Sequence, residues 1–131
     1  MPLIDSLQRM LPDFPKHLGL TYLEVSRDRI LAEMIVREDL SNGIGTLHGG
    51  ALMAFADTLG AVATMINIAP DAKTTTLESK TNFIAGATIG MKLIGEALPL
   101  HRGRRTHIWE TRITNTDGKL VAKVTQTQMI L

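Results

Sequence analysis

The sequence from His48 to Ala69 reads HGGALMAFADTLGAVATMINIA, and this stretch decides the fold class. Its part from Ala51 to Ala69 is nineteen residues long and mostly apolar, and Asp57 is its one ionised residue. The large apolar side chains are spread over different faces of a helix, with glycines and alanines between them. A helix without a polar face cannot lie on a surface, so we expect a sheet that curls around it and buries all its sides.

The same stretch is close to the length that crosses a bilayer, which gives a competing interpretation. However, a carboxylate near the middle of a membrane costs about 2.5 to 3.5 kcal/mol, and no clear belt of aromatic residues flanks the run. The start of the chain also lacks the basic and apolar regions of a secretory signal. We therefore predict a helix inside a cytoplasmic protein that does not contact a membrane.

On the amino-terminal side of this helix, the sequence predicts a short helix and a hairpin. Residues 3–11 carry apolar side chains at helical spacing and end before Pro12. Residues 21–26 and 30–36 alternate apolar and polar side chains around a polar turn, which is typical of a β-hairpin. Residues 37–47 have no period, so we expect a loop that runs up to the long helix.

On the carboxy-terminal side, we expect Pro70 to end the helix and strands to follow it. The strand-like segments are 74–84, 91–98, 104–114 and 120–130. Asp117-Gly118 is a strong hairpin signal between the last two. The order of elements predicts an α+β fold with a mostly antiparallel sheet, in a single domain that spans residues 1–131.

Charge and cysteine content exclude several classes of function. The 131 residues hold 14 Lys and Arg against 13 Asp and Glu, so the net charge of +1 provides no overall field for nucleic acid. The chain has no cysteine, which excludes disulfides, thiolate zinc sites and a cysteine nucleophile. Its four histidines lack paired ligand spacing. We therefore expect no metal and no nucleic-acid partner.

Asp57 is the first candidate for chemistry, because burying an ion costs several kcal/mol unless it is paired or functional. The second candidate is the glycine-rich segment 43–50 at the start of the same helix. It does not match the dinucleotide fingerprint, because the third glycine of that pattern would fall on His48. The N–H groups of Gly49 and Gly50, without intrahelical partners, suit a polarised carbonyl or a developing oxyanion.

The distance along the helix relates these two candidates. His48 and Asp57 are nine positions apart, which is about 13 Å at 1.5 Å per residue, too far to serve one small reacting group. They could meet if two chains packed antiparallel, with Asp57 of one beside Gly49 of the other. The spacing therefore predicts an active site shared across a two-fold dimer interface.

The residues around the start of the long helix also match a known family. The pattern Asn42-x5-His48-Gly49-Gly50-x6-Asp57 resembles the signature of the hotdog-fold acyl-CoA thioesterases, such as the phenylacetate-pathway, hydroxybenzoyl-CoA and dihydroxynaphthoyl-CoA thioesterases. The resemblance covers residues 15–131. It implies a curved antiparallel sheet around one long helix, and dimers joined edge to edge that usually pair into homotetramers.

The resemblance also implies a role for each motif residue in thioester hydrolysis. Asp57 matches the acidic catalytic residue, and Gly49 matches the backbone N–H that polarises the thioester carbonyl. His48 supports that geometry, and Asn42 positions the thioester or the attacking water. Some relatives carry Glu in place of Asp57 and attack through the carboxylate. Because Asp is one methylene shorter, we favour general-base activation of water.

In several relatives a Ser or Thr on the strand after the helix assists the water. Thr76 is the closest match to that position, and Thr74 and Thr75 compete with it because the length of the preceding loop is uncertain. No cofactor is implied, since coenzyme A is part of the substrate.

Binding residues are expected at two places. Family members hold coenzyme A across the surface near the subunit interface, where basic side chains contact its phosphates and arginine's fork suits the oxygens. A solvated loop is the alternative for the basic cluster here. The arginine candidates are Arg102, Arg104 and Arg105, with Gly50 at the helix start, and the expected lining of the acyl pocket is Phe55, Leu52 and Met53.

The function expected from the sequence is hydrolysis of an acyl-CoA to a free acid and coenzyme A. The alternative is a non-catalytic module of the same fold that binds acyl-CoA or an acyl carrier. Asp57 discriminates between them, because a pure binder has no need of a buried carboxylate beside a thioester. The acyl group, the choice between coenzyme A and acyl carrier protein, and the pathway are left open.

Overall fold

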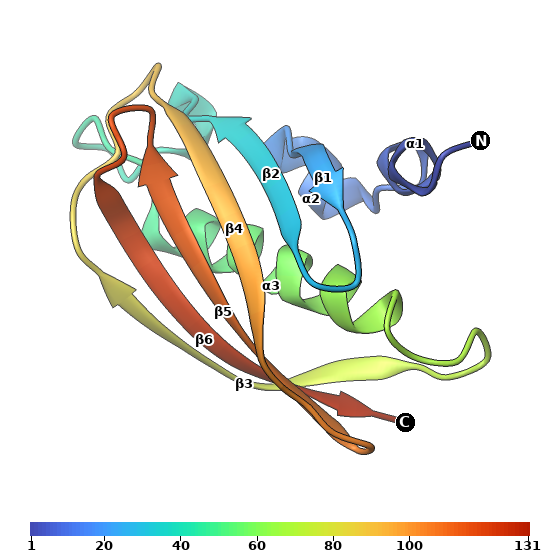
Figure 1. Cartoon of the computed structure of the whole chain (residues 1–131). Helices are drawn as coiled ribbons and strands as arrows, with labels where there is room; N and C mark the ends of the chain where they lie inside the picture. Colours follow the sequence, from blue (N-terminus) through green and yellow to red (C-terminus); the bar gives the residue numbers. More distant parts are fainter.

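A computed structural model describes residues 1–131 and contains one curved sheet around one long helix (Figure 1). In chain order the elements are α1 (Leu3–Arg9), α2 (Asp13–Leu18), β1 (Thr21–Val25), β2 (Ile30–Ile35), a 3-10 turn (Glu38–Leu40), α3 (Gly49–Met65), β3 (Thr74–Phe83), β4 (Lys92–Arg102), β5 (Thr106–Asn115) and β6 (Leu120–Ile130). No helix combines the length and the apolar character needed to span a bilayer.

The sheet has six strands in the order β1-β2-β4-β5-β6-β3, and every neighbouring pair is antiparallel. The predicted α+β class, both hairpins and all six strands are therefore confirmed. β3 follows α3 directly, yet it joins the far edge of the sheet beside β6. This crossover carries the chain along the helix and puts β3 against it.

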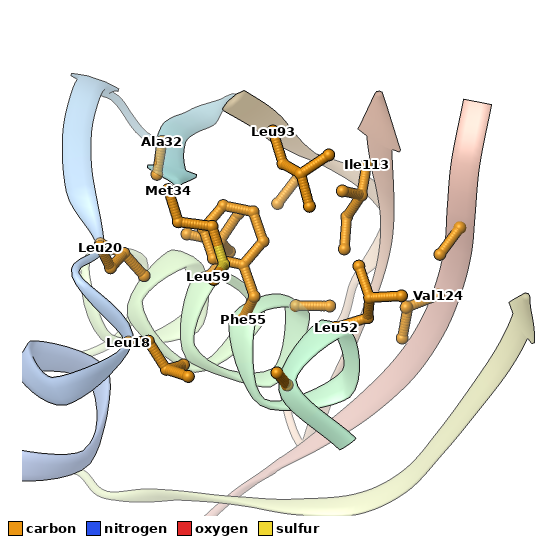
Figure 2. Close-up of a cluster of buried hydrophobic side chains, with 14 of the residues drawn as sticks. Leu18, Leu20, Ala32, Met34, Leu52, Phe55, Leu59, Leu93, Ile113 and Val124 are labelled. Atoms are coloured by element: carbon orange, nitrogen blue, oxygen red, sulfur yellow. The ribbon is translucent and has the colours of Figure 1, made fainter. Parts of the chain in front are cut away.

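The core lies between α3 and the inner face of the sheet. Figure 2 shows Phe55, Leu59 and Leu52 of α3 pointing toward Leu93, Ile113 and Val124 of the strands. Twenty-two buried apolar residues form one continuous cluster. Small residues on α3 permit close approach, as expected: a Cβ at Gly60 would overlap the carboxamide of Gln126 on β6. The sheet curved around one long helix is confirmed, but the sheet does not bury all sides of α3, since Met53, Asp57 and Ala61 are only half-buried.

Several boundaries differ from the sequence prediction: the strand expected at 91–98 extends from Lys92 to Arg102, and the helices also differ. The short helix expected at residues 3–11 is present as α1 but ends at Arg9, and a second helix that the sequence did not predict, α2, starts directly after Pro12. Proline is tolerated in the first helical turn, so Pro12 and Pro15 begin this helix instead of preventing one. In addition, α3 ends at Met65, before Pro70, where Asn67 Nδ2 donates to the Ala63 carbonyl at 2.8 Å.

The two edges of the sheet are not equivalent. Along β1, the Gln8 side chain of α1 covers the backbone: Gln8 Nε2 donates to the Leu20 carbonyl at 3.0 Å, and the Tyr22 N–H donates to Gln8 Oε1 at 2.8 Å. β3 has ten residues and pairs only with β6. Its outer edge is open, and Leu77 on this strand is 58% exposed. An uncovered edge of this length is a ready template for pairing with another strand.

Candidate active site

The start of α3 presents one free backbone donor. His48 caps the helix, and its Nδ1 accepts the Gly50 N–H at 2.8 Å, so its proton lies on Nε2. The Gly49 N–H has no acceptor in the chain, as the first N–H of a helix lacks an intrahelical partner. The expectation that both glycine N–H groups are free is therefore wrong for Gly50, because His48 occupies it.

Gly49 opens into a cavity of about 430 Å³. This Gly49 cavity is lined by Asn42, Thr46, Leu47, Gly49, Leu52, Phe83, Ile84, Ala85, Gly86 and Ala87. A Cβ at Gly49 would lie 3.0 Å from the Phe83 ring, so a larger residue would push on this wall. Asn42 shares the cavity, where its Nδ2 donates to Thr46 Oγ1 at 2.6 Å. The structure thus brings Asn42 and Gly49 together.

Asp57 lies eight residues further along α3, about 12 Å from Gly49 by helical rise. Its half-buried carboxylate accepts a hydrogen bond at Oδ1 from Thr76 Oγ1, at 2.6 Å. Oδ2 has no partner in the chain. Asp57 borders a different cavity of about 280 Å³, the Asp57 pocket, which is lined by Leu7, Met10, Leu11, Pro12, Pro15, Tyr22, Asp57, Thr58, Ala61, Val62 and Met65.

Among the three candidate threonines on β3, Thr76 is the one that contacts Asp57. Thr75 is exposed, and Thr74 Oγ1 donates to Gln128 Oε1 at 2.9 Å. Asp57 and Gly49 line no common cavity within the chain. His48 borders a third hollow, with Gly50 and Asp39.

Leu52 lines the Gly49 cavity, and the other predicted binding residues lie away from both cavities. Arg102 Nη1 donates to Asp28 Oδ1 and to the Arg27 carbonyl, each at 2.8 Å, so this guanidinium holds the β1–β2 turn. Arg104 and Arg105 are exposed and form no ion pair. Within one chain Phe55 is fully buried in the core and Met53 borders neither cavity.

A polar band that we did not predict from the sequence crosses the inner face of the sheet beneath α3. His107 on β5 pairs directly with Gln128 on β6, which pairs directly with Thr76 on β3. Gln128 Nε2 donates to Thr76 Oγ1 at 2.6 Å. Gln128 and its neighbour Gln126 are 0% and 1% exposed. The sequence did contain a signal for this band: side chains alternate between the two faces of β6, so both glutamines lie on the same inner face as Val124.

The same band reaches α3 at Thr64. Trp109 Nε1 donates to Thr64 Oγ1 at 2.8 Å, and the Thr64 hydroxyl lies 3.2 Å from His107 Nδ1. Burial lowers the pKa of His107, and the nearby charges of Arg102 and His101 act in the same direction. Beside the Asp57 pocket, burial raises the pKa of Tyr22 to about 12. No group of three or more metal-ligating side chains is present.

Comparison with known proteins identifies the family of the chain. Residues 44–122, more than half of the chain, match the thioesterase superfamily. The 1,4-dihydroxy-2-naphthoyl-CoA hydrolase of Escherichia coli is 30% identical over 114 residues, which cover 87% of this chain and 83% of that protein. The proofreading thioesterase EntH of Klebsiella pneumoniae is 32% identical over 103 residues, covering 79% and 74% respectively.

A solved structure gives the same result for the fold. The crystal structure of a mutant thioesterase from Pseudomonas aeruginosa superposes with a TM-score of 0.93 at 25% identity, covering 100% of this chain and 95% of that one. A curved antiparallel sheet wrapped around one long helix is the hotdog fold. The chain belongs to the thioesterase superfamily.

Proposed function

We propose that this protein hydrolyses acyl-CoA thioesters, with Asp57 as the general base. One observation carries the proposal: the single carboxylate of an otherwise apolar helix is half-buried and borders a mostly apolar pocket. Its Oδ1 is held by Thr76, and Oδ2 is left without a partner in the chain. A purely structural residue could avoid the desolvation cost of such an ion.

In the proposed reaction, the Asp57 carboxylate takes a proton from water while the water oxygen bonds to the thioester carbon. The carbonyl oxygen becomes an oxyanion and accepts the Gly49 N–H, which is free for this purpose. Collapse of the tetrahedral intermediate breaks the carbon–sulfur bond, and the departing thiolate receives the proton from Asp57. Asn42, in the Gly49 cavity, positions the thioester. His48 accepts the Gly50 N–H, so the Gly49 N–H is the donor that is left for the substrate.

The proposed site uses two copies of the chain. Asp57 and Gly49 are about 12 Å apart along one helix, whereas a thioester and its attacking water need both within a few ångströms. The open edge of β3 supports a dimer, because β3 runs beside α3 and the other sheet edge is covered by Gln8. A two-fold axis at β3 would bring Asp57 of one protomer near Gly49 of its partner and create two equivalent sites.

The Asp57 pocket favours an apolar acyl group. Seven of its eleven lining residues are hydrophobic. Among the others, Thr58 already donates its hydroxyl to the Ala54 carbonyl at 2.8 Å. An acyl chain with several hydroxyl groups would leave polar atoms unpaired there, at a cost of about 1–3 kcal/mol each. Filling the pocket with Ala61→Phe should reduce kcat/KM for long acyl groups more than for acetyl-CoA.

Arg104 and Arg105 are our candidates for the phosphates of coenzyme A, because both guanidinium groups are exposed and unpaired. Arg102 is committed to the β1–β2 turn and is a weaker candidate. Replacing Arg104 and Arg105 together by alanine should raise KM for acyl-CoA and leave kcat for a short thioester without coenzyme A unchanged.

Thiol release from a panel of aromatic and aliphatic acyl-CoA esters tests the proposed function. We expect wild-type turnover with at least one ester and a loss of at least about 100-fold in Asp57→Asn, as for removal of a general base. Asp71→Asn is the matched control, because Asp71 is exposed beyond the end of α3. Coenzyme A binding without hydrolysis of any ester would favour the non-catalytic binding module instead.

A further inference from the structure

We propose that Gln128 is a positioning residue for Asp57, acting through Thr76; this inference rests on the proposed function. Gln128 is fully buried between β3 and β5, and it lines none of the cavities. A buried carboxamide costs free energy unless its hydrogen bonds are made. The oxygen and the nitrogen of its carboxamide each form a hydrogen bond with a threonine hydroxyl of β3, so the side chain is held in one orientation.

The direction of each hydrogen bond follows from the chemistry of the groups. An ionised carboxylate only accepts, so the single proton of the Thr76 hydroxyl goes to Asp57 Oδ1 over 2.6 Å. Thr76 Oγ1 must then accept its second hydrogen bond, and Gln128 Nε2, a pure donor, lies 2.6 Å away. Gln128 Oε1 in turn accepts from Thr74 Oγ1 at 2.9 Å. Thr74 Oγ1 also lies 3.0 Å from the Met129 carbonyl, so its one proton has two acceptors, whereas the Thr76 proton in this row of hydrogen bonds goes to Asp57.

The order of these hydrogen bonds limits what Thr76 does in the reaction. The Thr76 proton is committed to Asp57, so Thr76 does not donate to the attacking water. Oδ1 is fixed by the row from Thr74 through Gln128 and Thr76, and Oδ2 is the oxygen left to take the proton from water. Gln128 does not touch the substrate, but its N–H donation to Thr76 directs the Thr76 proton toward Asp57. A carboxylate at position 128 would accept the Thr76 proton instead.

A matched control lies two residues away. Gln126 has the same side chain on the same strand, is 1% exposed, and has an Oε1 without a partner. Its Nε2 reaches only the Asp57 backbone carbonyl, at 3.5 Å, and it makes no hydrogen bond with Thr76. Gln126→Met and Gln128→Met therefore remove the same group from the same buried layer, but only the second breaks the row.

The experiment compares kcat and KM of these variants in thiol release from the best acyl-CoA ester. We expect Gln128→Met to lower kcat about 10-fold or more with KM nearly unchanged, and Gln126→Met to stay close to wild type. Thr76→Val should lose as much as Gln128→Met, the double variant should lose no more than either, and Thr76→Ser should restore most of kcat. Gln128→Glu should be slower than Gln128→Met, since its carboxylate accepts the Thr76 proton.

Three results would overturn the proposal: equal losses in Gln126→Met and Gln128→Met, multiplicative losses in the double variant, or equal activity of Thr76→Ser and Thr76→Val. The Thr76 substitutions are on an edge strand, so they still test the proposal if Gln128→Met does not fold. A wild-type protein that hydrolyses no ester would count against the proposed function instead. In that case a crystal structure of Gln128→Met with Thr76 and Asp57 in unchanged positions would still refute the positioning role.

Discussion

Thr64→Val tests whether the hydrogen bonds of the polar band under α3 contribute to the free energy of unfolding. The Thr64 hydroxyl accepts from Trp109 Nε1 at 2.8 Å and lies 3.2 Å from His107 Nδ1. Thr64 and Trp109 are 0% exposed, so water does not replace the lost partner. Valine has nearly the same shape as threonine, and the change therefore removes the hydroxyl and leaves no cavity.

The expected loss follows from the groups left behind. A buried donor or acceptor without a partner costs about 1–3 kcal/mol, and Thr64→Val leaves one of each. We expect a loss of about 2–6 kcal/mol in the free energy of unfolding, which for a chain of this length lowers the melting temperature by roughly 10–20 °C. Urea titration followed by the fluorescence of Trp109, the single tryptophan, reports directly from this contact.

Thr58→Val provides the control on the same helix. Thr58 Oγ1 donates only to the Ala54 carbonyl of its own helix, at 2.8 Å, and the side chain is partly exposed. Its replacement should change stability by less than about 0.5 kcal/mol. Both variants must be compared at one protein concentration, because subunit association shifts apparent stability. Equal losses in Thr64→Val and Thr58→Val would refute the role assigned to the band.

Two further predictions concern pH and assembly. Burial lowers the pKa of His107 from its usual 6.5, so below about pH 6.5 the unfolded chain binds more protons than the folded chain. The contribution of His107 to the free energy of unfolding should therefore fall with pH by at most about 1.4 kcal/mol per pH unit. The wild-type protein should lose stability more steeply than His107→Gln. Parallel pH–stability curves would contradict this. Leu77→Lys on the open edge of β3 should shift sedimentation from dimer to monomer and abolish turnover, whereas Leu100→Lys, at an equally exposed leucine (58%) on β4, should do neither.

The features that the sequence predicted well are those that depend on local patterns. A long apolar run with one charge requires a surrounding sheet, and the Asp117-Gly118 pair accurately marked the hairpin between β5 and β6. α2 was missed because Pro12 and Pro15 were interpreted as helix breakers, although both fit a first helical turn. Local pattern alone does not separate these two uses of proline.

The site was harder to predict, because Asp57 meets Thr76 only through the crossover of β3. Thr74, Thr75 and Thr76 are equivalent in sequence, and a bulge between Thr76 and Glu78 shifts the register on this strand. The occupied Gly50 N–H depends on the rotamer of His48, and a sequence does not specify that rotamer. Gln128 was missed because its partners are on another strand, although its inward parity on β6 follows from the alternation.

The central claim is that each active site combines Gly49 of one protomer with Asp57 of its partner, and subunit mixing tests it directly. Asp57→Asn removes the base. Gly49→Pro removes the free N–H at the first helical position, where proline is favoured and His48 is already extended. Each variant alone should be inactive.

After the two variants are mixed and their subunits exchanged, a heterodimer should hold one site with both wild-type groups and one site with neither. Half of the dimers are then mixed, each with one of its two sites intact, so we expect recovery of about a quarter of wild-type turnover. No recovery, with exchange verified by mass spectrometry of the mixed dimer, would contradict the shared site.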